Sequence, residues 1–132
     1  MTPVRVFTAA TSLAFGTIAL ARVPVTVPPP PRIELTQQQR QARDQACRDA
    51  ILRLFIAGPD RPEYLNVAFR RAATEFNIRG IGEILTSTVV ELRVYVVAMT
   101  EVYLAEDWIG SQPTYFQCRF GNEGDIVAVE VI

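Results

Sequence analysis

The sequence predicts an α+β domain in which one main helix packs on a small antiparallel β-meander. Three observations support this fold class. A segment around Cys47 has apolar residues at three- and four-residue spacing, a segment around Cys118 alternates apolar with polar residues, and each cysteine lies on the apolar side of its pattern. A helix packed across an antiparallel sheet would bring the two cysteines together. We expect this single domain to span residues 35–132.

The first 21 residues have the features of an export signal. Arg5 is the only charged residue before Arg22, and the mostly apolar stretch between them ends in Ala-Leu-Ala at residues 19–21. A charged start, a short apolar run and a small-residue exit are typical of a cleaved signal peptide, whereas a spanning helix needs about 20 predominantly apolar residues. We therefore expect residues 1–21 to be removed and the protein to be periplasmic or secreted. The alternative is a signal anchor, which would leave the protein membrane-anchored and facing outside the cytoplasm.

A proline-rich linker is expected over residues 22–34, between the export signal and the domain. Residues 28–31 are consecutive prolines. Such a run favours the extended polyproline II conformation, which has no internal hydrogen bonds. The linker is therefore expected to act as a stiff spacer.

The residue types that are missing exclude several kinds of chemistry. The chain contains no His, and its 13 basic residues are all Arg. Without His there is no imidazole base for a serine or cysteine nucleophile, and without Lys there is no Schiff base and no P-loop lysine. Two distant cysteines do not make a zinc site. We expect no metal, no cofactor and no enzymatic activity.

The charge of the chain gives no basis for a nucleic-acid partner. Its net charge is −1, and its Arg residues are scattered and not clustered.

The two cysteines predict a disulfide. In an exported chain an even number of cysteines indicates disulfide bonding, and with only two the pairing must be Cys47–Cys118. The bond would close a long loop, for which the chain-entropy model gives a stabilisation of about 4 kcal/mol. A reactive thiol is the less favoured alternative, because no C-x-x-C motif, Lys or His is present to lower a thiol pKa.

The main helix is expected over residues 36–57. Thr36 and Gln39 match a capping box at its start, and Gly58-Pro59 is a strong stop signal. Its apolar residues fall on one face and its charged residues are expected on the opposite, solvated face. The apolar set is Cys47, Ala50, Ile51, Leu54 and Phe55, and the charged set is Arg43, Asp44, Arg48, Asp49 and Arg53.

Residues 64–77 fit either a second helix or a short strand. Phe69, Ala72 and Phe76 lie at helical spacing, while residues 64–69 have the composition of a strand. We favour a short helix. Gly80 and Gly82 then indicate a break before the sheet.

The first part of the meander is expected to be one long strand. Residues 88–104 have apolar even positions that face the core and mixed odd positions. This length exceeds one regular strand, so we expect a bulge or bend near residues 98–100. Residues 105–113 are expected to form a turn region.

The rest of the meander is expected to be a hairpin. Residues 114–120 form its first strand, residues 121–124 a tight connection and residues 125–132 the last strand. The inward-facing residues are expected to be Phe116, Cys118, Phe120, Val127, Val129 and Val131.

The order of these elements resembles that of small exported bacterial proteins of uncharacterised function. The shared features are a signal peptide, a Cys-bearing helix and a β-meander whose penultimate strand carries an aromatic-x-Cys-x-aromatic motif. Here that motif is Phe116-Gln117-Cys118-Arg119-Phe120, and the resemblance covers roughly residues 40–132. The resemblance implies a fold and no activity.

Four residues are candidates for partner binding. Tyr95, Met99 and Tyr103 form a stripe with Val97 on the expected outer face of the sheet, which would mark an interface unless residues 64–77 or the bend cover it. The fourth candidate, Trp108, lies at a turn, where an exposed Trp could anchor a partner. We favour the alternative that Trp108 folds back onto the open end of the sheet, because Trp is usually largely buried.

These observations favour a non-catalytic exported interaction or accessory module that binds a cell-envelope protein through a sheet face or a hairpin tip. One alternative is a membrane-anchored accessory subunit of an integral membrane complex, with the membrane as a partner only if the N-terminal segment is retained. A carboxylate-dependent enzyme would need Glu106 and Asp107, or Glu101 and Glu91, placed across a cleft. A small-ligand binder would need a cavity lined by Phe and Tyr between helix and sheet.

Overall fold

A computed structural model describes residues 34–56 and 60–132 of the chain. The chain divides into two units, Met1–Pro31 and Arg32–Ile132. The first unit, which holds the expected signal segment and most of the expected linker, lies outside the described residues. The second unit forms the domain described below.

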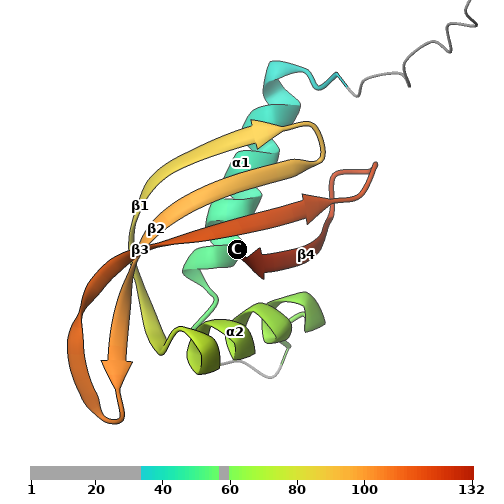
Figure 1. Ribbon diagram of the computed structural model, residues 1–132. Coiled ribbons are helices and arrows are strands. Elements are labelled where there is room, and N and C mark those ends of the chain that lie inside the picture. The colour runs from blue at the N-terminus through green and yellow to red at the C-terminus, as the bar shows by residue number, and fades with distance from the viewer. Residues whose placement is uncertain (1–33, 57–59) are drawn as a thin grey trace, which may run out of the picture. The chain divides into compact units, whose positions relative to one another are not determined.

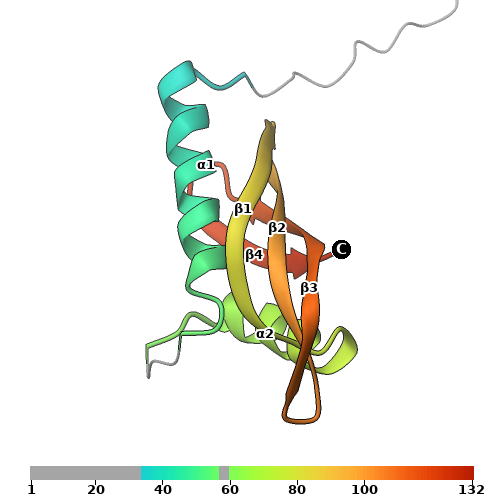
Figure 2. The same cartoon turned by 90° about the vertical axis from the view of Figure 1, so that its left-hand side faces the viewer.

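The domain has two helices followed by four strands, which confirms the predicted α+β fold class. The elements are α1 (Gln37–Leu52), α2 (Glu63–Glu75), β1 (Ile78–Val90), β2 (Arg93–Leu104), β3 (Asp107–Phe120) and β4 (Ile126–Val131). The strands form one antiparallel sheet in the order β1-β2-β3-β4, so each strand pairs with the next one in the sequence. Both helices lie on the same face of this curved sheet (Figures 1 and 2). α1 packs on all four strands, and α2 packs on β4 and β1.

The hydrophobic core lies between the helices and the sheet face that they cover. In β2 the even positions Val94, Val96 and Ala98 are buried, as predicted, and the odd positions point to the opposite face. The helices and the remaining strands add Cys47, Ala50, Ile51, Leu54, Leu65, Ala68, Ala72, Ile78, Phe116, Cys118, Phe120, Val129 and Val131. Of the inward residues predicted for the last two strands, Val127 alone is exposed. The pairing of β3 with β4 shifts between Arg119 and Phe120, and this irregularity takes Val127 out of the alternation.

The predicted disulfide joins α1 to the middle of the sheet. Cys47 and Cys118 are bonded, with their Cα atoms 5.9 Å apart, and neither residue is accessible to solvent. Cys118 is flanked in the sheet by Val94 of β2 and Val129 of β4. The bond therefore fixes the helix against a position that has paired strands on both sides.

α1 begins as predicted and ends earlier than predicted. The backbone N–H of Gln39 donates to Thr36 Oγ1 at 3.1 Å, and the N–H of Thr36 donates to Gln39 Oε1 at 2.8 Å, which completes the capping box. The helix stops at Leu52 and not at residue 57, and Gly58-Pro59 lie outside the described residues. Arg61 stabilises the turn that follows, because its guanidinium donates to the carbonyl oxygens of Leu54 and Ile56.

The second segment is helical, as favoured. α2 buries Leu65, Ala68 and Ala72, and Pro62 precedes its first residue. A proline is well tolerated at this point because its missing N–H is not needed by the first turn. The alternative of a short strand over residues 64–69 is wrong.

The long strand predicted over residues 88–104 is wrong. The chain turns at Glu91-Leu92, between β1 and β2. The irregularity expected near residues 98–100 is present in the pairing of β1 with β2, where the extra residue lies on β1 between Ile81 and Ile84, whereas β2 pairs regularly with β3 there. Glu91 has a φ of 53°, a left-handed conformation usually taken by Gly or Asn. Because the turn has two residues, the core-facing positions are even-numbered in β2 but odd-numbered in this part of β1. Val89 is therefore half-buried and Val90 is exposed.

Gly80 and Gly82 do not separate the second helix from the sheet. Both lie inside β1, where its pairing with β2 is irregular. A Cβ atom at Gly82 would lie 3.3 Å from the carbonyl oxygen of Met99 on the neighbouring strand. This glycine therefore permits a close approach of two strands, a role that glycine often has within a sheet.

Candidate functional site

β2 and β3 extend beyond the rest of the sheet as a two-stranded hairpin. The pairing of β1 with β2 reaches no further than Ile78 opposite Val102, and the pairing of β4 with β3 no further than Val131 opposite Phe116. Residues 103–109 thus have only each other as strand neighbours among the described strands, and we call them the hairpin tip. Figure 1 shows the hairpin projecting at the lower left, away from the end at which α1 begins.

The turn region predicted for residues 105–113 is therefore wrong. The turn consists of Ala105-Glu106, and β3 begins at Asp107. Gly110 and Pro113 made this segment resemble a loop, but both are accommodated in the strand. Gly110 has a φ of 146° beside the shift in pairing between Val102 and Tyr103, and Pro113 pairs with Met99. β4 does not extend as far as Pro113, so on the β4 side of β3 no neighbouring strand needs a hydrogen bond from the N–H group that proline lacks.

The hairpin tip exposes three large apolar side chains. Leu104 is 62% exposed, and Trp108 and Ile109 are each 58% exposed. Trp108 pairs with Tyr103 across the hairpin. The expectation that Trp108 folds back onto the sheet is wrong, because the hairpin carries it past the core that would have covered it.

The polar side chains at the hairpin tip are acidic. The carboxylate of Glu106, whose side chain is 92% exposed, lies 3.6 Å from the guanidinium of Arg79 in β1. Arg79 also donates to the carbonyl oxygen of Ala105 at 2.5 Å and lies over the ring of Tyr103, 5.2 Å from its centre. Arg79 thus links β1 to the hairpin tip, and Asp107 adds a second carboxylate beside Trp108.

The predicted apolar stripe lies on the sheet face that the helices leave open. Tyr95, Val97 and Met99 are half-buried by their neighbours in the sheet, and Tyr115 of β3, opposite Val97, is exposed. Residues 64–77 form α2 on the other face and do not cover the stripe (Figure 2). Arg93 borders it, and a side-chain hydrogen bond with Tyr95 raises the pKa of Arg93.

The carboxylate pairs that were considered for acid–base work do not face each other. Glu106 and Asp107 are neighbours at an exposed turn, and Glu91 and Glu101 lie near opposite ends of β2. Glycoside hydrolysis uses two carboxylates on either side of the scissile bond. Neither pair has that geometry.

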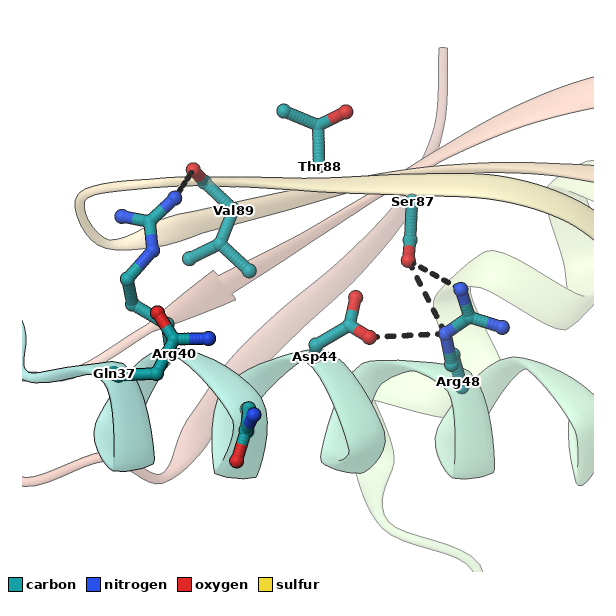
Figure 3. Close-up of a pocket in the computed structure, with 8 residues that line it drawn as sticks. Gln37, Arg40, Asp44, Arg48, Ser87, Thr88 and Val89 are labelled. Carbon is teal, nitrogen blue, oxygen red and sulfur yellow. Dashed lines mark hydrogen bonds and ion pairs between the residues drawn. The ribbon is translucent and has the colours of Figure 1, made fainter.

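A polar groove of about 390 Å³ lies between the first half of α1 and the end of β1 (Figure 3). Arg48 Nε donates to Asp44 Oδ2 at 3.0 Å and Arg48 Nη2 donates to Ser87 Oγ at 2.7 Å, while Arg40 Nη2 donates to the carbonyl oxygen of Val89 at 3.0 Å. The bonds to Ser87 and Val89 fasten the helix to β1. The groove is not lined by the Phe and Tyr side chains that a small-ligand binder would need between helix and sheet.

The position of Arg43 also differs from the prediction. It was assigned to the solvated face of the helix, yet it is only 6% exposed, and its guanidinium lies over the ring of Phe120 at 5.6 Å from the ring centre. The spacing contains the signal that was overlooked, because Arg43 is four residues before Cys47 and therefore on the same face of the helix. Next to it is a pocket of about 450 Å³ between α1 and the turn that joins β3 to β4.

In the described part of the chain, no three His, Cys, Asp or Glu side chains are grouped so that they could hold a metal ion. None of the described helices has the length and apolar character needed to span a bilayer.

No protein-family model, curated protein or solved structure gives a significant match to this chain. The functional argument therefore rests on the geometry of the sites themselves.

Proposed function

We propose that this domain is a non-catalytic, disulfide-stabilised interaction module of the cell envelope, which binds a protein partner through the hairpin tip. The observation that carries the proposal is the exposure of Leu104, Trp108 and Ile109 together on a projecting hairpin. Trp is among the residues most enriched at the energetic centres of protein interfaces, where it fills a pocket on the partner.

The base of the hairpin is well suited to presenting the tip. Thr100 of β2 and Thr114 of β3, which are diagonal neighbours across the strand pair, are buried, and their hydroxyl oxygens are 2.7 Å apart. Arg79 adds its contacts from the β1 side. A recognition element that is already ordered before binding loses less conformational entropy when the partner docks.

The charges of the hairpin tip specify the chemistry of the partner. Glu106 and Asp107 flank the apolar side chains, so the complementary surface is an apolar pocket with a basic rim. The same acidic charges disfavour an anionic lipid surface, which repels carboxylates. We therefore propose a protein and not a membrane as the occupant of the tip.

The stripe of Tyr95, Val97 and Met99 would extend the contact if the partner is large. It lies on β2, which continues into the hairpin tip, and on the face that no helix covers. Its side chains are less accessible than those of the tip, so we assign them the periphery of the interface.

Location in the cell envelope is part of the proposal. The Cys47–Cys118 bond is compatible with an oxidising compartment outside the cytoplasm, where disulfides form and persist. The residues of the expected export signal support the same location.

Site-specific photo-crosslinking in the native host tests the proposed interface. A photoreactive amino acid at position 108 should give a discrete adduct with one envelope protein, and the unlabelled domain should compete for it. Position 67 of α2 is the matched control, because Val67 is also an exposed apolar residue but lies on another element. Glu106→Arg/Asp107→Arg should abolish the adduct by reversing the charge. Equal crosslinking from positions 108 and 67, or an adduct that survives the charge reversal, would contradict the proposal.

A further inference from the structure

We propose that Arg43 and the pocket beside it bind a small carboxylate. The site lies between α1 and the β3–β4 turn, at the opposite end of β3 from the hairpin tip, and it does not depend on the proposed partner interface. Its lining residues are Gln39, Ala42, Arg43, Asn122, Glu123 and Gly124.

The first step in the argument is the state of the Arg43 side chain. Arg43 is 6% exposed, and its Nη1 atom is buried without a hydrogen-bond partner among the described residues. The contact with the Phe120 ring places the guanidinium over an aromatic face, which is favourable but does not neutralise its charge. Arginine cannot escape this situation by losing a proton, because a guanidinium stays protonated in proteins.

The second step is that no acidic side chain among the described residues is paired with Arg43. No ion pair within 4.0 Å among the described residues involves Arg43. Residues 1–33 and 57–59 contain no Asp or Glu, so no acidic side chain lies outside the described part. A buried charge without a partner is strongly unfavourable. An anion from solution would remove that cost.

The third step is that the pocket gives an anion access to the guanidinium. A Cβ atom at Gly124 would lie 3.8 Å from Arg43 Nη2, so a side chain at this position would lie against that edge of the guanidinium, and glycine places none there. Gly124 has a φ of 91°, which disfavours any other residue there. Gln39 already uses its Oε1 in the helix cap, which leaves its amide N–H groups as donors. The amide of Asn122 provides further donors on the other side of the pocket.

The class of ligand follows from the shape and the charge of the site. The planar fork of a guanidinium matches the two oxygens of a carboxylate in a bidentate pair. Glu123 also lines the pocket, and its negative charge opposes a phosphate dianion more than a singly charged carboxylate. The carboxylate could belong to a small metabolite or to the C-terminus of a peptide, and the test distinguishes these sources.

The test is an NMR titration of the oxidised full chain. Sodium acetate, inorganic phosphate and a short peptide with a free C-terminus are compared with sodium chloride at equal ionic strength. Acetate should cause saturable shifts of the Arg43 side-chain Nε–H and of the backbone amides of residues 122–124, with tighter binding than phosphate. Peptide binding tighter than that of acetate would identify a peptide C-terminus as the ligand, and equal binding would identify a small free carboxylate.

Three variants make the test specific. Arg43→Met should weaken acetate binding at least about tenfold, because it removes the cation and keeps the length of the side chain. Ala42→Leu fills the pocket from an exposed helix position, leaves Arg43 in place and should also weaken binding, which covers the case in which Arg43→Met does not fold. Glu123→Gln should strengthen binding. The proposal would be overturned if acetate caused the same shifts as chloride. It would also be overturned if Glu123→Gln lowered the stability of the domain without strengthening acetate binding, because Glu123 would then be the counter-ion of Arg43.

Discussion

Cys47 in α1 and Cys118 in β3 are bonded across a sequence separation of 71 residues, which ties the helix to an inner strand of the sheet. On either side of Cys118, Val94 and Val129 belong to strands paired with β3. A bond at this position closes most of the domain into one loop, so it restricts the unfolded chain strongly.

Removal of the disulfide is expected to destabilise the domain by about 4 kcal/mol, as the chain-entropy model gives for a loop of this length. The measurement is urea unfolding of Cys47→Ala/Cys118→Ala beside the oxidised protein, followed by circular dichroism. Because both cysteines are inaccessible to solvent, a reductant should act on the native protein only slowly and rapidly in denaturant. An unchanged urea midpoint in the double variant would contradict this view of the bond.

The fold class and the disulfide were predictable because two local patterns agreed. The helical spacing around Cys47 and the alternation around Cys118 each place a cysteine toward the core, and the structure confirms both. Arg43 was misplaced because its charge was taken as a sign of exposure, although its spacing to Cys47 places it on the buried face. The residue type of Arg43 indicates exposure, whereas its position on the helix indicates burial. The side chain is buried, because its guanidinium can lie against the ring of Phe120.

The hairpins were harder to predict because their turns lack the usual residues. Glu91 and Ala105 adopt φ values of 53° and 57° where Gly or Asn would be typical. Conversely, Gly110 and Pro113 lie inside a strand. Their conformations depend on pairing between β2 and β3, which a local pattern does not contain. As a result, the extent of the projecting hairpin, and with it the exposure of Trp108, could not be obtained from the sequence.

Trp108 should report its own exposure by fluorescence. It is the single Trp of the chain, so the emission has one source. We expect a red-shifted spectrum close to that of free tryptophan and efficient quenching by acrylamide in the native protein, with little further red shift on unfolding. A blue-shifted native spectrum that is resistant to quenching would mean that the hairpin tip is covered, and would count against the proposed interface.

Trp108→Ser should leave the free energy of unfolding within about 0.5 kcal/mol of the parent, because the side chain contributes little to the core. Phe116→Ala is the matched contrast in the same strand, since Phe116 is fully buried, and should cost about 3–5 kcal/mol. Urea unfolding followed by circular dichroism measures both variants. A large loss of stability in Trp108→Ser would show that Trp108 serves packing and not recognition.

The buried threonine pair at the base of the hairpin should behave as a coupled unit. Thr100 Oγ1 donates to the carbonyl oxygen of Gln112 at 2.9 Å, and that hydroxyl lies 2.7 Å from the hydroxyl of Thr114. Thr100→Val leaves the Thr114 hydroxyl without its partner in a buried place and should cost about 1–3 kcal/mol. Thr114→Val should cost less, because Thr100 keeps its bond to Gln112, and the double Val variant should cost less than the sum of the two. Additive costs in urea unfolding would mean that the two hydroxyls act independently.

The state of the N-terminus should separate the secreted module from the membrane-anchored alternative. Arg22 follows the Ala-Leu-Ala triplet, so cleavage of the expected signal gives a chain that begins at Arg22. We expect intact-mass analysis of protein made in its host to show this chain, two hydrogens lighter than the reduced form and alkylated only after reduction, because Cys47 and Cys118 are bonded. A full-length mass confined to the membrane fraction would instead identify residues 1–21 as an anchor. In that case the prolines would act as a spacer that holds the domain off the bilayer, and the partner of the hairpin tip should be sought within an integral membrane complex.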